Sequence, residues 1–410
     1  MKPKVISLFS GAGGLDYGFE AAGFETAVAL EMDHDCCETL RRNRDWRVIE
    51  SDIMQVSSEQ LLREAKLKVG QAAVLIGGPP CQPFSKAGYW SKGDSLRLDD
   101  PRANTLSAYL RVLEETRPHA FVLENVEGLA YRGKDEGLRL LLEAIQAINR
   151  RTRSKYRVSM QVLNAADFGV PQIRKRVLLV GARDGTQFQF PTPTHSEAPE
   201  SDLFAKIEPH RTAWDALADV TPDADEELAI RGRWADLLPS IPEGHNYLWH
   251  TDRMGGMPLF GWRRRYWSFL LKLAKNQPSW TIQAQPGPAI GPFHWANRRL
   301  SMRELMRLQT FPDDVVITGS RTEVQRQLGN AVPSLLGEVV AREIKKQLLN
   351  LSAPRPPLQL LPPNRSPAPP AEAVAPVPRK FWKLKGQHSA HPGTGRGNAA
   401  IVRSQEANAT

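Results

Sequence analysis

A cysteine that could act as a nucleophile, Cys81, lies between prolines in the sequence Gly-Gly-Pro-Pro-Cys-Gln-Pro-Phe. This segment directly follows residues 73–76, an apolar run typical of a buried β-strand. Proline fixes φ, so we expect a stiff loop that holds the thiol beyond the end of that strand. A free cysteine is commonly an inert core residue, and Cys81 on its own also fits that interpretation. Its assignment therefore depends on the groups around it.

Two other strand ends carry groups that could assist such a nucleophile. Glu124 follows the apolar run 120–123, and Arg174 and Arg176 precede the apolar run 177–180. Ligands of open α/β sheets bind beyond the carboxyl ends of the strands, so we expect these three side chains to converge on the thiol. The alternatives are a helix cap for Glu124 and surface ion pairs for the arginines.

A glycine-rich turn near the N-terminus is typical of a nucleotide-binding site. Phe9-Ser10-Gly11-Ala12-Gly13-Gly14 follows a strand-like run and leads into a helix, whose first amide groups could face a ligand. Glu31 lies 20 residues beyond Gly11, at the end of the next strand, where a carboxylate can accept from ribose hydroxyls. Asp52 and Ile53 end the third strand and suit an adenine ring. These residues predict an adenosine-bearing ligand and leave both NAD and S-adenosylmethionine open.

The alternation of strands and helices from residue 4 to residue 183 predicts a doubly wound, Rossmann-like α/β sheet. Amphipathic helices are expected at residues 103–116 and 136–149. Such a sheet brings the chemical groups named above to one edge. The predicted strands are residues 5–9, 26–30, 47–50, 73–76, 120–123, 157–163 and 177–180.

The rest of the chain divides into three further parts. Residues 184–297 contain seven of the ten tryptophans and show no βαβ rhythm, so we expect a smaller inserted domain. Helical signals return in residues 298–351, where Ser301 and Glu304 have the spacing of a capping box. Residues 352–410 are rich in proline and carry most of the formal net charge of +9, so we expect a disordered basic tail.

Composition excludes several classes of protein. No run of about 20 apolar residues is present and no signal peptide fits the N-terminus, so the sequence predicts a cytoplasmic protein without a membrane span. Three cysteines do not make a disulfide framework. Cys36 and Cys37 lie near His34 without the spacing of a zinc site, so we expect helix packing there rather than a metal.

Together these segments resemble the DNA cytosine-5 methyltransferase family over residues 4–350. The resemblance implies transfer of a methyl group from S-adenosylmethionine to C5 of a cytosine within a specific sequence of duplex DNA. The family's signatures follow in its order as Phe9 to Gly14, Pro79-Pro80-Cys81, Glu124-Asn125-Val126, Gln172-x-Arg174-x-Arg176, Arg298-Arg299-Leu300 through Gln309, and Gln327-Leu328-Gly329-Asn330-Ala331-Val332-Pro333.

The resemblance also implies a role for each matched residue. Cys81 would add to C6 of the base, Glu124 would hold or protonate N3, and Arg176 would contact O2 and orient Glu124. Arg174 is expected to meet a backbone phosphate. These four residues form the expected catalytic set. The expected cofactor residues are Phe9, Ser10, Gly11, Gly13, Gly14, Glu31, Met32, Asp52, Ile53, Pro79, Leu106, Asn330 and Val332.

DNA contacts are expected from two segments. Residues 85–102 have the glycines and cations of a loop that closes over DNA with the target base flipped out, and a plain mobile loop is the alternative. The insertion interleaves arginines and aromatic residues, as around Trp234, which suits a DNA groove; a tryptophan core with solvated arginines is the alternative. The expected DNA-binding residues are Gln82, Ser85, Lys86, Lys92, Arg97, Arg102, Arg263, Arg264, Arg265 and Thr281.

The resemblance implies a monomer that acts on double-stranded DNA, with a cognate restriction endonuclease as a genetic partner. A tRNA cytosine-5 methyltransferase shares the catalytic plan and is the nearest alternative. That branch usually carries Cys-Phe-Thr in the insertion, whereas residues 184–297 contain no cysteine. A catalytically inactive DNA-binding regulator would not need Cys81, Glu124 and Arg176 together. No segment resembles the nicotinamide site of a dehydrogenase.

Overall fold

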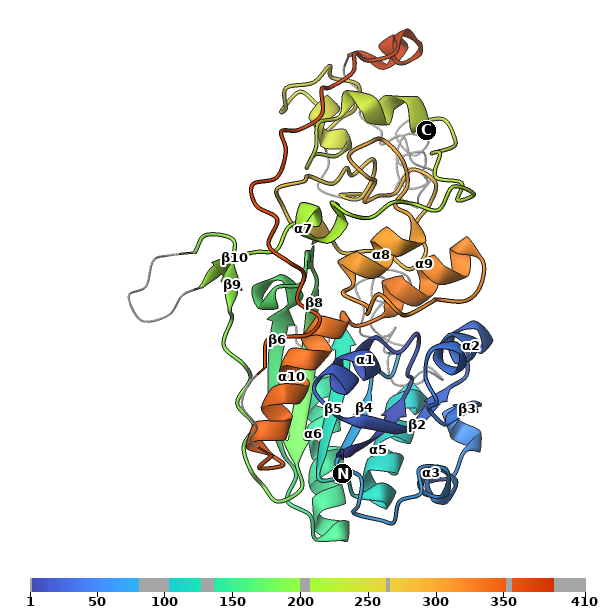
Figure 1. Cartoon of the computed structure of the whole chain (residues 1–410), viewed down its shortest axis with the longest axis vertical. Helices are drawn as coiled ribbons and strands as arrows, with labels where there is room; N and C mark the ends of the chain where they lie inside the picture. The colour runs from blue at the N-terminus through green and yellow to red at the C-terminus, as the bar shows by residue number, and fades with distance from the viewer. Residues whose placement is uncertain are drawn as a thin grey trace, which may run out of the picture.

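A seven-stranded sheet forms the centre of the lower part of the molecule in Figure 1. The computed structural model describes residues 2–80, 103–126, 136–199, 207–262, 266–351 and 356–386. The strand order β3-β2-β1-β4-β5-β8-β6 confirms the predicted doubly wound α/β sheet, because the direction of winding reverses next to β1. The strands are β1 (Lys4–Leu8), β2 (Glu25–Glu31), β3 (Val48–Glu50), β4 (Val74–Gly77), β5 (Ala120–Val126), β6 (Arg157–Asn164) and β8 (Lys175–Ala182).

Strand β8 is the exception in an otherwise parallel arrangement. The first five strands pair in parallel, whereas β8 runs antiparallel to both β5 and β6. The amino-terminal end of β8 therefore lies at the edge where the other strands have their carboxyl ends. All seven predicted strands are present, with bounds that differ by a few residues.

Helices cover both faces of the sheet, because its alternating side chains are apolar on both sides. One face packs against α3 (Ser58–Glu64), α5 (Ala103–Thr116) and α6 (Glu136–Thr152). The other face packs against α1 (Gly14–Ala21) and α10 (Ser334–Gln347) (Figure 1). Both predicted helices of this region are confirmed. Among the described residues, no helix has the length and apolar character needed to cross a bilayer.

Helices α1 and α10 approach each other closely at Gly18. A Cβ atom at this position would lie 2.3 Å from the Ser334 carbonyl oxygen and 2.6 Å from the Glu338 backbone nitrogen. Both are backbone atoms of a helix and cannot move aside independently. Glycine at this position therefore lets α10, the last helix on this face of the sheet, pack closely against α1, the helix that follows β1.

Between residues 184 and 297 the chain forms a part with little regular structure. An apolar cluster that includes Tyr247, Phe260 and Phe269 packs around Trp234, which is only 8% exposed. Trp234 thus belongs to an aromatic core, as the alternative interpretation of this part held. The elements here are β9 (His195–Ser196), β10 (Glu208–Pro209), α7 (Ala213–Leu217), η6 (Ala235–Ser240), η7 (Tyr247–His250) and β11 (Ser279–Trp280).

The chain then returns to the sheet through α8 (Met302–Leu308), α9 (Arg321–Asn330) and α10. The predicted capping box is confirmed at the start of α8. Ser301 Oγ accepts from the Glu304 amide at 3.1 Å, and Glu304 Oε2 accepts from the Ser301 amide at 2.7 Å. Helices α8 and α9 share an apolar cluster with α7, which joins the base of the insertion to the rest of the fold.

Part of the C-terminal tail follows a defined path, which corrects the prediction of disorder for residues 356–386. This segment runs along the outside of the molecule and ends in η8 (Arg379–Leu384) (Figure 1). Leu361 packs with the core of the sheet and Phe381 with that of the insertion. Prolines restrict the unfolded chain, so ordering the segment costs less than the usual 1–2 kcal/mol or so per residue. Residues 352–355 and 387–410 lie outside the described residues.

Substitution of Gly18 tests the close approach of α1 and α10. We expect Gly18→Ala to lower the free energy of unfolding by about 1–3 kcal/mol, because the added methyl group must push backbone atoms apart. Gly287→Ala is the matched control, since a Cβ there meets only Ile290 Cγ1 at 3.5 Å. Urea unfolding monitored by tryptophan fluorescence measures both. Equal stability of the two variants would contradict the assigned contact.

Candidate active site

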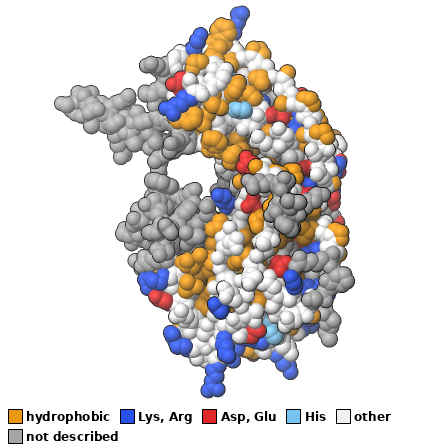
Figure 2. Space-filling model, turned by 90° about the vertical axis from the view of Figure 1, so that its left-hand side faces the viewer, with side chains coloured by type: hydrophobic (Ala, Val, Ile, Leu, Met, Phe, Trp, Pro, Cys, Tyr) orange, Lys and Arg blue, Asp and Glu red, His pale blue; other side chains and the backbone are white. Residues whose placement is uncertain are grey.

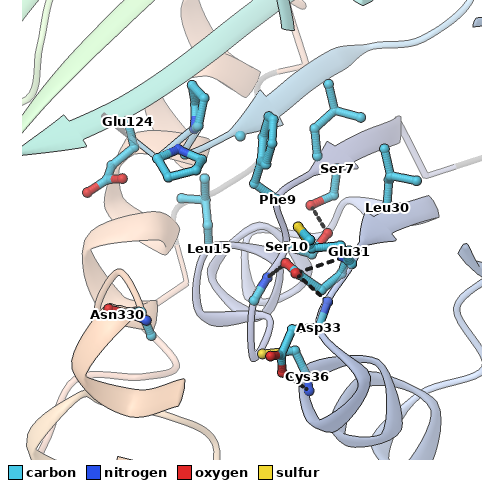
Figure 3. Close-up of a pocket in the computed structure, with 18 of the residues that line it drawn as sticks. Ser7, Phe9, Ser10, Leu15, Leu30, Glu31, Asp33, Cys36, Glu124 and Asn330 are labelled. Carbon is cyan, nitrogen blue, oxygen red and sulfur yellow. Dashed lines mark hydrogen bonds between the residues drawn. The ribbon is translucent and has the colours of Figure 1, made fainter. Parts of the chain in front are cut away.

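A cavity of about 660 Å³ lies at the carboxyl edge of the sheet (Figure 3). Its walls come from the ends of β1 to β5, from η1 (Ile53–Gln55) and from the end of α9. Figure 3 shows Glu31, with Ser10 and Asp33, at one end of the cavity and Glu124 at the other. These carboxyl groups end strands three positions apart, which corresponds to about 14 Å. The site is therefore long enough for an extended ligand.

The turn from β1 to α1 depends on residues with positive φ. Phe9, Gly11 and Gly13 have φ values of 54°, 53° and 82°. Gly11 has no atom within 4 Å of the position of a Cβ, so its surface faces open space. At Gly14 a Cβ would lie 2.3 Å from the Val332 carbonyl oxygen. The glycines thus serve different purposes: Gly11 leaves room in the cavity, and Gly14 lets α1 begin against the segment that follows α9.

Glu31 holds this turn against β2. Its Oε2 accepts from the Gly11 amide at 2.7 Å, and its Oε1 accepts from the amides of Met32 and Asp33 at 2.8 and 3.0 Å. A carboxylate offers about four lone-pair sites, so Glu31 can still accept from a ligand in the cavity. Its role toward a ribose stays a prediction.

Asp52 and Ile53 follow β3, which is the strand next to β2 in the sheet. Asp52 accepts from the Met54 amide at 2.9 Å and thereby begins η1. Met32 and Met54 are 69% and 57% exposed, which is unusual for large apolar side chains. Thioether side chains beside a carboxylate suit a flat ring that carries an amino group.

Glu124 and Arg176 form an ion pair at the opposite end of the cavity. Arg176 Nε lies 2.8 Å from Glu124 Oε1, and each side chain is 13% exposed. Burial raises the pKa of Glu124, while the positive charges of Arg176 and Arg174 oppose that rise. A carboxyl group in this environment can hold a proton and transfer it to a ring nitrogen.

Arg174 does not line the cavity, which corrects the expectation that it contacts a DNA phosphate. Its side chain is fully buried, and its guanidinium donates to the carbonyl oxygens of Ile282 at 3.3 Å and Gly329 at 2.6 Å. Burial, and then the charge of Arg176, lower the pKa of Arg174 well below its usual value. Arg174 is therefore a positioning residue that ties the sheet to α9 and to the end of the insertion.

Pro79 and Pro80 directly precede Cys81, the predicted nucleophile, and their carbonyl groups accept hydrogen bonds from neighbouring elements. Asn125 Nδ2 donates to the Pro79 carbonyl at 3.2 Å, and Thr105 Oγ1 donates to the Pro80 carbonyl at 3.2 Å. Both prolines line the cavity. The residues expected to follow them in the site lie outside the described residues; these are Cys81, Gln82, Ser85, Lys86, Lys92, Arg97 and Arg102.

Within the insertion, Thr281 is described, whereas Arg263, Arg264 and Arg265 lie outside the described residues. Thr281 follows β11, which pairs with β7 (Gln172–Ile173). Its hydroxyl donates to the Ile173 carbonyl at 2.7 Å. The threonine thus lies beside the short strand that leads into β8 and Arg176.

Most of the predicted cofactor residues line one cavity. Two do not: Gly13 is the N-cap of α1 with Leu40 against it, and Leu106 packs with the core of the sheet. For Gly13 the reason is the direction of the turn, since a Cβ there would point away from the cavity and meet Leu40 at 2.9 Å. Those that line the cavity are Phe9, Ser10, Gly11, Gly14, Glu31, Met32, Asp52, Ile53, Pro79, Asn330 and Val332.

Several cavity residues were missed from the sequence. Asp33 had a local signal, because it precedes α2 (His34–Asn43) as its N-cap and accepts from the Cys36 amide at 3.0 Å. Arg326 of α9 donates to Asp33 at 2.9 Å. It had no local signal in the sequence, because this contact joins opposite ends of the chain. The missed residues include Ser7, Asp16, Asp33, Thr105 and Arg326.

Cys36 and Cys37 pack inside the protein, as predicted. They are 4% and 0% exposed, and both belong to α2. Burial raises the pKa of Cys37 to about 12 and raises that of Cys36 as well. Neither thiol forms a thiolate readily, so neither suits the role of a nucleophile.

Comparison with known proteins identifies the family of the chain. The family model for C-5 cytosine-specific DNA methylases matches residues 3–346. Type II methyltransferase M.SacI of Streptomyces achromogenes is 42% identical over 372 residues, covering 84% of this chain and 93% of that protein. Type II methyltransferase M.AquIA of Picosynechococcus is 48% identical over 254 residues, covering 60% of this chain and 100% of that protein.

Solved structures share the fold at lower identity. A prophage-encoded putative DNA modification methyltransferase of E. coli is 23% identical with a TM-score of 0.57, covering 85% of this chain and 99% of that one. DNMT2 of Spodoptera frugiperda is 16% identical with a TM-score of 0.56, covering 84% and 99%. Since the family model spans most of the chain and the relative M.SacI is 42% identical over most of both proteins, the chain belongs to the C-5 cytosine-specific DNA methylase family and is a DNA cytosine-5 methyltransferase of the type II kind.

Proposed function

We propose that the protein methylates C5 of a cytosine flipped out of duplex DNA, using S-adenosylmethionine and a covalent bond between Cys81 and C6. The observation that carries this proposal is that the Glu124–Arg176 pair and Glu31 occupy opposite ends of one cavity. One end suits an adenosine and the other a ring with a basic nitrogen. Pro80, which precedes Cys81 in the sequence, lines the same cavity.

The donor set of the cavity fits S-adenosylmethionine. Glu31 would accept from the ribose hydroxyls and Asp52 from the adenine amino group, while Met32 and Met54 would contact the ring. When bound, S-adenosylmethionine supplies an electrophilic methyl group. The family match favours it over NAD, which these residues alone leave open.

Addition of a thiolate is needed because C5 of cytosine is a weak nucleophile. The Cys81 thiolate would add to C6, the C5–C6 π pair would shift to C4–C5, the C4–N3 π pair would shift to N3, and N3 would take the proton of Glu124, which becomes a carboxylate. The resulting enamine has a nucleophilic C5 that can accept a methyl group. Loss of the C5 proton, expulsion of Cys81 as thiolate and return of the N3 proton to Glu124 would restore the aromatic ring.

Arg176 would donate to O2 of the base while it keeps Glu124 oriented. The 2.8 Å ion pair supports this role because it holds the carboxyl group in one position. The raised pKa of Glu124 favours the protonated form that N3 requires. The two side chains together would bind the edge of the base and remove its developing negative charge.

Access to such a cavity requires the base to leave the duplex. Residues 85–102 would close over the DNA, and residues 184–297 would read its sequence. Thr281 supports the second assignment, because it joins the insertion to β7 beside the catalytic pair. The type II relatives support a role in modifying one specific sequence, with a cognate endonuclease as genetic partner. Bisulfite sequencing of DNA from cells that express the protein would identify that sequence.

The covalent step leads to a trapping experiment. DNA with 5-fluorocytosine at the mapped target position should remain attached to the enzyme in the presence of S-adenosylmethionine, because fluorine cannot leave C5 as a proton does. A denaturing gel would show the complex as a slower band. Cys81→Ser should abolish the band and retain DNA binding. A band with Cys81→Ser would contradict the mechanism, and trapping on RNA alone would favour the tRNA methyltransferase alternative.

The pH dependence of the rate tests Glu124. Its proton is present below its raised pKa and lost above it, so the single-turnover rate of the wild-type enzyme should fall as pH rises through that value. Glutamine can donate a hydrogen bond but transfers no proton, so Glu124→Gln should be about 10²-fold slower or more and lack this dependence. Glu115→Gln, at a 49% exposed side chain, is the control. An unchanged pH profile in Glu124→Gln would refute the assignment.

A further inference from the structure

Residues 356–386, here called the strap, connect the catalytic sheet with the far end of the insertion. In Figure 1 the strap leaves α10 and runs up the side of the molecule to η8 at the top. The family match ends at residue 346, so the strap lies beyond it. Its contacts fall into three groups along its length.

The inner end is bound to α10 through charged side chains. Glu338, which is fully buried, accepts from the backbone amides of Gln359 at 2.8 Å and Leu360 at 3.0 Å. Arg342 donates to the carbonyl oxygens of Pro356 and Pro357 at 2.5 and 2.8 Å. A buried carboxylate that accepts from strap amides fixes the register of the strap on the helix.

The middle of the strap is bound to the base of the insertion. The Arg365 amide donates to Asp215 Oδ1 at 2.5 Å, and its guanidinium lies 2.7 Å from Asp219. Further along, Lys275 Nζ lies 2.9 Å from Glu372 of the strap and 2.7 Å from Glu243 of the insertion. Lys275 is buried, and the two carboxylates together accept hydrogen bonds from its desolvated ammonium group.

The outer end completes the aromatic core of the insertion. Phe381 is 4% exposed and stacks on Trp234 with a ring-centroid distance of 5.7 Å and an interplanar angle of 13°. Trp234 in turn contacts Phe260 and Phe269. The Ala375 amide donates to the Pro239 carbonyl at 3.0 Å. The outer core of the insertion is therefore built partly from the strap.

Two cations of the strap are paired with carboxylates of the insertion. Arg365 pairs with Asp219, and Lys380 pairs with Asp236. Charges already paired with carboxylates of the protein gain little from a DNA backbone. These two pairs therefore help to hold the strap on the insertion.

We propose that the strap positions the insertion over the catalytic cavity, so that the correct DNA sequence can be held there. This rests on the proposed function, in which the insertion reads DNA. Figure 2 shows the molecule hollowed between the sheet-bearing part and the insertion, where DNA would enter. Loss of the contacts made by the outer end of the strap lets the outer core of the insertion shift and leaves the cavity intact, which weakens DNA binding rather than chemistry.

Phe381→Ala tests the proposal, with Trp382→Ala as a matched control because the neighbouring Trp382 is 52% exposed. On a short duplex that carries the mapped target sequence, Phe381→Ala should raise KM for DNA about tenfold or more, with kcat changed by less than about twofold. The Kd for S-adenosylmethionine should be that of the wild type. Trp382→Ala should resemble the wild type in all three quantities.

A milder variant decides the question if Phe381→Ala does not fold. Glu372→Gln removes one charge at a 60% exposed side chain and should raise KM for DNA severalfold with kcat unchanged. The proposal is overturned if Phe381→Ala and Glu372→Gln match Trp382→Ala in KM, or if they lower kcat alone.

Hydrogen exchange separates failure of the proposal from failure of the proposed function. In Phe381→Ala, amides of residues 234–262 should exchange faster than in Trp382→Ala, while those of β1 and β4 should not change. Wild-type protein that methylates no DNA would refute the proposed function, and this exchange pattern would still test the strap. If the amides of residues 234–262 exchanged at the same rate in Phe381→Ala and Trp382→Ala, the positioning role would be overturned.

Discussion

The antiparallel pairing of β8 with β5 is the constraint on which the Glu124–Arg176 end of the cavity depends. In this register Arg176 lies directly opposite Val126, and Glu124 lies two residues before Val126 on the same face of the sheet. The two side chains are therefore diagonal neighbours and can form their 2.8 Å ion pair. A shift of one residue would turn Arg176 to the other face and leave a buried carboxyl group without its cation.

The same edge of the sheet explains why the other groups meet there. The turn after β1, the carboxylate of Glu31 at the end of β2 and the prolines after β4 all lie at carboxyl ends of parallel strands. Arg174 links this edge to α9 and to the end of the insertion through two carbonyl groups. Its full burial makes that link costly to break, because an unpaired guanidinium would remain in the interior. The Glu124 end and the Glu31 end of the cavity are thus held by one continuous framework.

The insertion is held together by interactions other than those of a sheet. It has few regular elements, and its order comes from an aromatic core around Trp234 and from charged groups such as Lys275 that are paired in the interior. The strap contributes Phe381 to that core and Glu372 to the pairing of Lys275. An extended, proline-rich segment can make these contacts because proline limits the entropy that ordering removes. The position of the insertion therefore depends on residues far along the chain.

Local pattern in the sequence determined the strands, the helices α5 and α6, the capping box at Ser301 and most of the cofactor edge, because each rests on neighbouring residues or on the period of a strand or helix. It placed Glu124 and Arg176 at strand ends without revealing that they pair, since pairing depends on the register of β8. It misassigned Arg174, whose burial is decided by Ile282 and Gly329, and it took residues 356–386 for disordered because their partners lie elsewhere in the chain. Tertiary structure alone decided those points, because burial and long-range pairing are properties of the folded chain and leave no periodic signal in the sequence.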